Sequence, residues 1–215
     1  MADYKDVKYN VDYGDATGAA GGLIRIATAH QATILNSADT GTATMDFTSG
    51  ITSAHDVYLF EISGMIPHGT QQLSFQVDTG TNTNYNITNT SMRTRFYHKN
   101  DNSAIGQNAH DGPNSNDTNL ILFGLGQKGT GTDGGFETRG TIGGHLYLYN
   151  PSSTVFEKHW IAKLAGTANA GGAHVVESHE TAGYFQTTTA ITRVRFKYNS
   201  GNIDAGRITM FGLAK

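Results

Sequence analysis

Cysteine is absent from the 215 residues of this chain. Its absence excludes disulfide scaffolds, cysteine zinc sites, iron–sulfur clusters and thiol nucleophiles, and it agrees with folding in a reducing cytosol. Proline occurs only three times, which argues against a disordered proline-rich linker. The chain therefore has to be held together without disulfide bonds or cysteine-bound metals.

Charge and long apolar runs are also scarce. Charged residues make up 15% of the chain, against about 25% in an ordinary soluble protein, and the net charge is −3. Without a basic excess to neutralise phosphates, we expect no nucleic-acid partner. No run approaches the length of a membrane span, and the first residues lack the apolar region of a signal peptide. We therefore expect no membrane partner, no secretion, and synthesis in a cytoplasm.

The residues that are abundant favour β-structure. Glycine numbers 27 and phenylalanine and tyrosine 10 each, and threonine is frequent. Residues 73–78 (LSFQVD) and 193–198 (RVRFKY) alternate between apolar and polar side chains, which is typical of a strand with one buried face. In 193–198 the alternation puts three cations on one face and three apolar side chains on the other.

The spacing of such segments predicts an all-β fold. Roughly eight to ten short strands are separated by turn clusters, and no stretch keeps a helical period with caps at both ends. The expected fold class is an antiparallel β-sandwich or barrel. We expect one domain over 23–215, a polar N-terminal arm over 1–22, and long polar loops over 99–118 and 126–143.

One short string resembles an enzyme motif. Residues 75–81 (FQVDTGT) contain the D-T-G sequence of aspartic proteases, with Asp78 as the candidate catalytic carboxylate. That chemistry needs two carboxylates that share one proton, so a single copy could act only in a symmetric dimer. The same string is typical of a strand that ends in a tight turn, which is the interpretation we favour.

Two further patterns suggest ligands. Residues 124–129 (GLGQKG) match G-x-G-x-x-G, but the glycine-rich stretch that follows cannot begin the helix that a dinucleotide site needs. We therefore expect no cofactor. His179 and Glu177 would share one face of a strand and form a weak metal site, although exposed polar residues are the favoured interpretation, and we expect no metal.

Basic residues form alternating pairs in two places. Arg93 and Arg95 lie near Tyr97, and a second group follows about a hundred residues later, namely Arg193, Arg195, Lys197 and Tyr198. Together they could form a basic patch for anionic sugars. A solvated sheet face, which also discourages edge pairing, is the favoured interpretation.

Three longer stretches resemble a known family. They are FTSGI at 47–51 running into DVYLF at 56–60 and MIP at 65–67, GHLYLYNPSST at 144–154, and GYFQTTTAITRVRF at 183–196 continuing to SGNIDAGRITMFG at 200–212. These strings are similar to short virion structural proteins of marine tailed bacteriophages, often described as tail-fibre-like. Together they span 47–212, with gaps at the long polar loops.

The resemblance implies a jelly-roll-like sandwich and a non-enzymatic structural subunit of a tailed-phage virion. A capsid decoration protein is the expected role, because the arm is too short for a fibre shaft. A tail-fibre or receptor- and carbohydrate-binding tail protein is the alternative. Expected partners are the major capsid protein or tail proteins, host-surface glycans, and further copies of the chain.

We expect these copies to form a homotrimer. Tyr147, Tyr149, Phe156 and Trp160 are more large rings than one sheet face readily buries, and a sandwich leaves sheet edges that need covering. Subunits of a virus shell also commonly sit on symmetry axes, where repeated contacts close into a ring.

Overall fold

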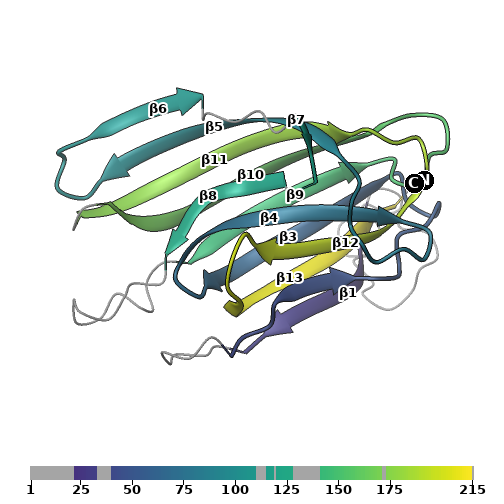
Figure 1. Cartoon of the computed structure of the whole chain (residues 1–215), viewed down its shortest axis with the longest axis horizontal. Helices are drawn as coiled ribbons and strands as arrows, with labels where there is room; N and C mark the ends of the chain where they lie inside the picture. Colours follow the sequence, from purple (N-terminus) through teal and green to yellow (C-terminus); the bar gives the residue numbers. More distant parts are fainter. Residues whose placement is uncertain are drawn as a thin grey trace, which may run out of the picture.

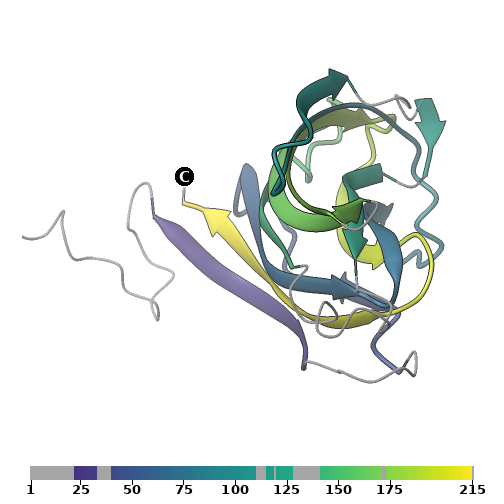
Figure 2. The ribbon, with the colours of Figure 1, turned by 90° about the vertical axis from the view of Figure 1, so that its left-hand side faces the viewer.

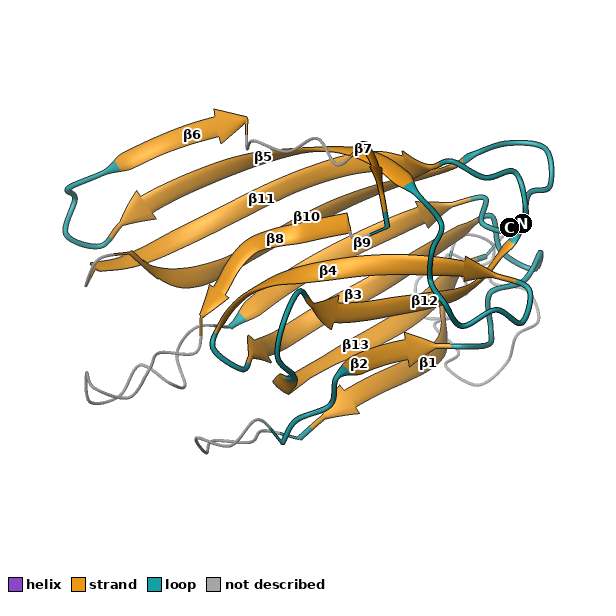
Figure 3. Ribbon diagram, in the orientation of Figure 1, coloured by secondary structure: helices purple, strands orange, loops and turns teal. Residues whose placement is uncertain are grey.

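Thirteen β-strands and no helix are found in the part of the chain that this computed structural model describes, residues 22–32, 40–109, 115–118, 120–127, 141–170 and 173–214 (Figure 3). The strands are β1 (Leu23–Gln31), β2 (Thr44–Phe47), β3 (Val57–Pro67), β4 (Thr70–Thr79), β5 (Asn89–Lys99), β6 (Ile105–Ala109), β7 (Ser115–Asp117), β8 (Leu120–Gln127), β9 (Ile142–Tyr149), β10 (Lys158–Ala170), β11 (Ala173–Phe185), β12 (Ile191–Tyr198) and β13 (Ile203–Leu213). The predicted all-β class is confirmed, although the strands exceed the expected eight to ten.

The strands form two antiparallel sheets that pack face to face (Figure 1). The larger sheet has the order β1-β13-β3-β9-β10-β11-β5-β6, with β7 beside β5. The smaller sheet has the order β2-β12-β4-β8. The larger sheet curls around the smaller one (Figure 2), as expected from the right-handed twist of strands. The predicted antiparallel sandwich is therefore confirmed.

Eight of these strands have the connectivity of a jelly roll. Along the chain, β1, β3, β9 and β13 enter the larger sheet, while β2, β4, β8 and β12 enter the smaller one. The chain thus crosses repeatedly between two four-stranded layers, as in double-sheet jelly rolls. The strands β5, β6 and β7 are inserted between β4 and β8, and β10 and β11 between β9 and β12. Of these five, β10, β11, β5 and β6 continue the larger sheet beyond β9, and we call these four strands the extension.

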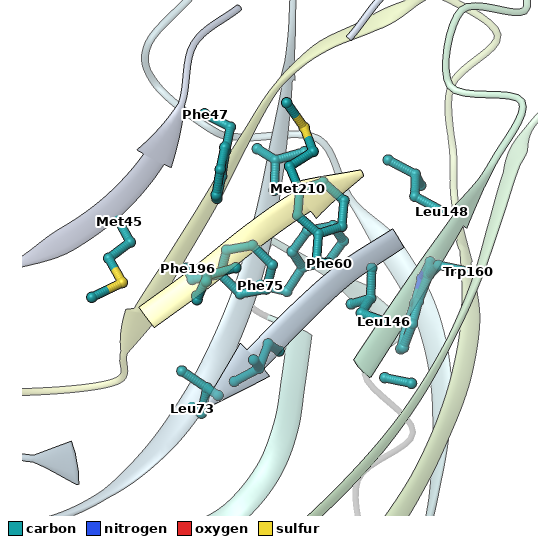
Figure 4. Close-up of a cluster of buried hydrophobic side chains, with 14 of the residues drawn as sticks. Met45, Phe47, Phe60, Leu73, Phe75, Leu146, Leu148, Trp160, Phe196 and Met210 are labelled. Carbon is teal, nitrogen blue, oxygen red and sulfur yellow. The ribbon is translucent and has the colours of Figure 1, made fainter. Parts of the chain in front are cut away.

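The core between the sheets is centred on aromatic rings (Figure 4). Phe75 of β4 lies 5.1 Å from Phe196 of β12 and 5.7 Å from Phe185 of β11, measured between ring centroids. The ring of Trp160 on β10 lies 6.5 Å from Phe75. These rings connect the two jelly-roll layers to the extension, so both parts of the larger sheet share one core.

The alternation predicted for 193–198 is confirmed in β12. Val194, Phe196 and Tyr198 are buried, whereas the cations between them lie on the opposite face. Arg195 donates two hydrogen bonds to Asp46, with Nε–Oδ1 and Nη2–Oδ2 distances of 2.9 and 2.6 Å. Its guanidinium group also lies 3.8 Å from the centre of the Tyr85 ring. Arg195 on the outer face of this strand is therefore held by specific pairing.

The expected long loops and the expected N-terminal arm differ in how much of each the structure describes. The predicted loop over 99–118 contains β6 and β7, because both strands complete their hydrogen bonding by pairing with β5. Most of the loop over 126–143 and of the arm over 1–22 lies outside the described residues. Gly22 is the exception in the arm, and its carbonyl accepts a hydrogen bond from the Ala214 N–H at 2.9 Å. None of the described residues belongs to a helix that could span a membrane.

Candidate interaction surface

An apolar row crosses the outer face of the larger sheet. The strand register places one apolar side chain from each of six adjacent strands side by side, and we call this row the outer band: Met92, Ala182, Ile161, Tyr147, Leu59 and Phe211. Met92 is 66% exposed and Ile161 46% exposed. Sheet faces that meet only water normally carry polar side chains at such positions, so this face is typical of a binding surface.

Aromatic side chains border the outer band on one side. The rings of His159 and Tyr184 lie 6.0 Å apart across β10 and β11. Tyr149 stacks on Tyr147 with their centroids 6.4 Å apart and an interplanar angle of 20°. A shallow groove lies between Met92 and Tyr184, because Ala182 is short and leaves room between its larger neighbours. This groove is almost entirely apolar.

Charged side chains border the outer band on the other side. Lys163 of β10 donates a hydrogen bond to Glu180 of β11 over 2.6 Å, and both side chains are more than half exposed. An ion pair in that position adds little stability, because water screens both charges. An apolar centre with a polar margin is the usual arrangement of a protein–protein interface.

The four rings that the sequence analysis grouped together are separated in the structure. Trp160 is fully buried in the core, while Tyr147 and Tyr149 lie half-buried on the outer face. Phe156 belongs to the loop between β9 and β10 and is 69% exposed. The four rings therefore do not share one sheet face, and Trp160 contributes nothing to the surface.

The loop that carries Phe156 is ordered by its own hydrogen bonds. The Ser153 hydroxyl accepts the backbone N–H groups of Val155 and Phe156, at 3.2 and 3.0 Å. Val155 and Phe156 are equally exposed, and we call this pair the loop knob. Because the backbone beneath it is fixed, the loop knob can bind without a large loss of backbone entropy.

The prediction that Glu177 and His179 are exposed is wrong. Both side chains are buried, and His179 Nε2 lies 2.9 Å from Glu177 Oε2. The sequence resembles that of an edge strand, but β11 lies between β10 and β5 and turns these two residues toward the interior. Among the described residues there is no group of three or more potential ligands that could hold a metal ion.

Arginine side chains from β5 complete this buried group. Arg95 donates to Glu177 Oε1, and its guanidinium lies 4.7 Å from the centre of the Tyr97 ring. Arg93 is buried close by. We call Arg93, Arg95, Glu177 and His179 the buried charged cluster.

The proposed joint basic patch does not form. Arg93 and Arg95 face the interior from β5 of the larger sheet, whereas Arg193, Arg195 and Lys197 lie on the outer face of β12 in the smaller sheet. Tyr198 is buried on the opposite side of β12 from these cations. The two basic segments therefore belong to different sheets and do not meet.

Asp78 has a structural role at the end of β4. Its carboxylate is fully buried and accepts the backbone N–H of Thr79 at 2.8 Å through Oδ1 and that of Tyr85 at 2.7 Å through Oδ2. Tyr85 has a positive φ of 49°, which the second hydrogen bond helps to hold. The D-T-G string thus forms the tight turn that the sequence analysis favoured.

The glycine pattern at 124–129 lies at the end of a strand. Residues 124–127 belong to β8 and pair with β4 rather than beginning a helix. Lys128 and Gly129 lie outside the described residues. The helix N-terminus that would hold a pyrophosphate is therefore not formed by the described part of this motif.

The buried charged cluster has perturbed pKa values. Burial lowers the pKa of His179 below its ordinary 6.5, and the hydrogen bond to Glu177 opposes this only in part. Burial would raise the pKa of Glu177, but the hydrogen bond with His179 and the charge of Arg95 outweigh it and lower the pKa. His179 is therefore neutral and Glu177 charged at neutral pH.

These shifts predict a loss of stability in acid. Because both folded-state pKa values are lowered, the unfolded chain binds more protons as the pH falls, first at His179 and then at Glu177. The urea midpoint should fall between about pH 7 and about pH 5, and the His179→Gln variant should show a flatter dependence. The exposed His30 provides the control, since His30→Gln should keep the wild-type slope. Equal slopes for all three proteins would contradict the assignment to His179.

Comparison with protein family models, with curated proteins and with solved structures finds no match to this chain.

Proposed function

We propose that this chain is a non-enzymatic structural subunit of a tailed-phage virion, most specifically a capsid decoration protein on the particle surface. The outer band carries the proposal, because it is an apolar row across six strands in which Met92 and Ile161 are exposed, and such a row is suited to binding another protein. The sequence resemblance over 47–212 supplies the phage context. Jelly rolls also occur in viral capsid proteins, although this analogy concerns the fold alone.

The first partner in this proposal is a second copy of the chain. The loop knob of one copy packs into the groove of the outer band between Met92 and Tyr184 on the next copy. The two surfaces differ, so the contact is heterologous, and a threefold rotation between neighbouring copies would close it into the expected homotrimer. The remaining outer surface is left for the major capsid protein or a tail protein.

Light scattering tests the homotrimer. The wild type should have the mass of three chains at micromolar concentration, and Phe156→Ser should be monomeric because it removes the apolar side chain of the loop knob. Ile105→Ser is the matched control, since Ile105 is 78% exposed on β6 away from the groove, and this variant should remain trimeric. A monomeric wild type, or the same loss in both variants, would contradict the proposed contact.

The location in the particle tests the function itself. Mass spectrometry of purified virions should find the chain at high copy number, and cryo-electron microscopy should show its density on the capsid. A few copies per particle at the tail would instead support a tail-fibre protein. Detection in infected-cell lysate but not in purified particles would defeat the structural role.

A second candidate function is binding of host-surface glycans. The stacked rings of Tyr147 and Tyr149 favour it, because sugar rings pack against flat aromatic surfaces. A glycan array should then show binding that Tyr149→Ala reduces and that Tyr184→Ala, on the far side of His159, leaves largely intact. Absence of binding to every glycan and to host cells would exclude this candidate.

A further inference from the structure

The interior face of the extension carries more positive than negative charge. On β5, alternation turns Arg93, Arg95 and Lys99 toward the same side. On the neighbouring strand β11, Glu177 is the acidic residue of the facing set, and His179 beside it is neutral. Among the described residues of these two strands, one carboxylate therefore faces three cations.

The hydrogen bonds of Glu177 are already committed. Its Oε1 accepts from Arg95 Nη2, and its Oε2 lies 2.9 Å from His179 Nε2. Because a carboxylate can only accept, His179 donates through Nε2. Neither of these hydrogen bonds involves Arg93, and Glu177 provides no acceptor for Arg93 Nη1.

Two buried guanidinium N–H groups lack an acceptor. Arg93 is 8% exposed, and its Nη1 has no hydrogen-bond partner among the described residues. Arg95 Nε is buried and also without a partner. Leaving a buried charged donor without an acceptor costs free energy, so such a pair of donors indicates a missing acceptor.

We propose that a small oxyanion binds between Arg93 and Arg95 and accepts hydrogen bonds from Arg93 Nη1 and Arg95 Nε. The two residues are adjacent on one side of β5, about 7 Å apart along the strand, which suits a group with several acceptor oxygens. Entry is through Arg95, whose side chain is 23% exposed. The chemistry fits an inorganic oxyanion or the carboxylate of another molecule equally.

Burial of Arg93 supports this site. This burial lowers the pKa of the Arg93 guanidinium. The charge of Glu177 opposes the shift, and the charge of Arg95 lowers the pKa further. A bound oxyanion would offset the repulsion between the two arginines. The site lies beneath the outer band on the opposite face of β5 and β11, so occupation would stiffen the strands that carry the proposed interface.

Thermal unfolding of the full chain tests the site, with sodium sulfate and sodium acetate each compared with sodium chloride at equal ionic strength. At ten times Kd the midpoint should rise by about 3–6 °C. Arg93→Met should abolish this rise, whereas Arg193→Met, on the outer face of β12, should retain it. A larger Arg93-dependent rise with sulfate would indicate an inorganic oxyanion, and with acetate a carboxylate.

Two further measurements distinguish binding at this site from a general effect of sulfate and from a folding defect in the variant. Sulfate stabilises many proteins by exclusion from their surface, so a rise of equal size in wild type and Arg93→Met would overturn the proposal. If Arg93→Met does not fold, Arg93→Lys keeps the charge but loses the forked donors, and isothermal titration calorimetry should then show at least tenfold weaker binding. Unchanged affinity in Arg93→Lys, or no binding to the wild type, would also overturn it.

Discussion

Replacing Phe75 with alanine should lower the free energy of unfolding by about 3–5 kcal/mol. Phe75 is fully buried and contacts the rings of Phe60, Phe196 and Phe185, with centroid distances of 6.2, 5.1 and 5.7 Å. These rings belong to both sheets and to the extension, so the cavity cannot close by the movement of one strand. Urea unfolding followed by Trp160 fluorescence would measure the loss.

A matched control separates this loss from a general effect of removing a phenyl ring. Phe96 points to the outer face of β5 and is partly exposed, so Phe96→Ala should cost less than about 1 kcal/mol. Similar losses in the two variants would show that Phe75 is not the centre of the core.

The second large effect is expected from Glu177→Gln. The substitution leaves the buried Arg93 and the partly buried Arg95 without the carboxylate on their side of the sheet, and breaking a buried ion pair on one side costs about 3–5 kcal/mol. Circular dichroism in increasing urea, at low salt and neutral pH, would give the loss. The oligomeric state should be measured in parallel, because it changes apparent stability.

Glu180→Gln is the control for that substitution. Glu180 is three residues further along β11, but it faces outward and its partner Lys163 is more than half exposed, so the expected loss is about 0–1 kcal/mol. A loss at Glu177 no greater than that at Glu180 would show that the buried charged cluster contributes little to stability.

The sequence predicts best those strands that have an apolar face in the core and a polar face outside. β12 is the clear example, because Phe196 and its apolar neighbours are buried while the cations face outward as expected. In β4 the apolar face of 73–78 is buried as expected, but the expectation that its other face is exposed is wrong, since Ser74 and Asp78 are also buried. Fold class and antiparallel pairing could therefore be predicted from alternation and turns.

The extension departs from that rule, and the candidate surfaces lie there. In β5 and β11 the charged residues Arg93 and Glu177 face the interior, while Met92 and Val176 are exposed. Alternation indicates that a strand has two different faces, but it does not say which one is buried. The cations Arg93 and Arg95 lie on the same face of the paired strands as the carboxylate of Glu177. Opposite charges of this kind in two segments are the sequence signal that could have indicated their pairing.

The placement of β12 and β13 has a consequence for how the chain reaches its fold. β13 lies between β1 and β3, and β12 between β2 and β4, so two strands that are synthesised after the other described strands fill the middle of both jelly-roll sheets. Such distant pairings make folding slow. Until the ribosome releases residues 191–213, the earlier strands have unsatisfied edges and are prone to aggregation. Chaperone protection of the nascent chain, and loss of solubility on premature termination, follow from this order of strands.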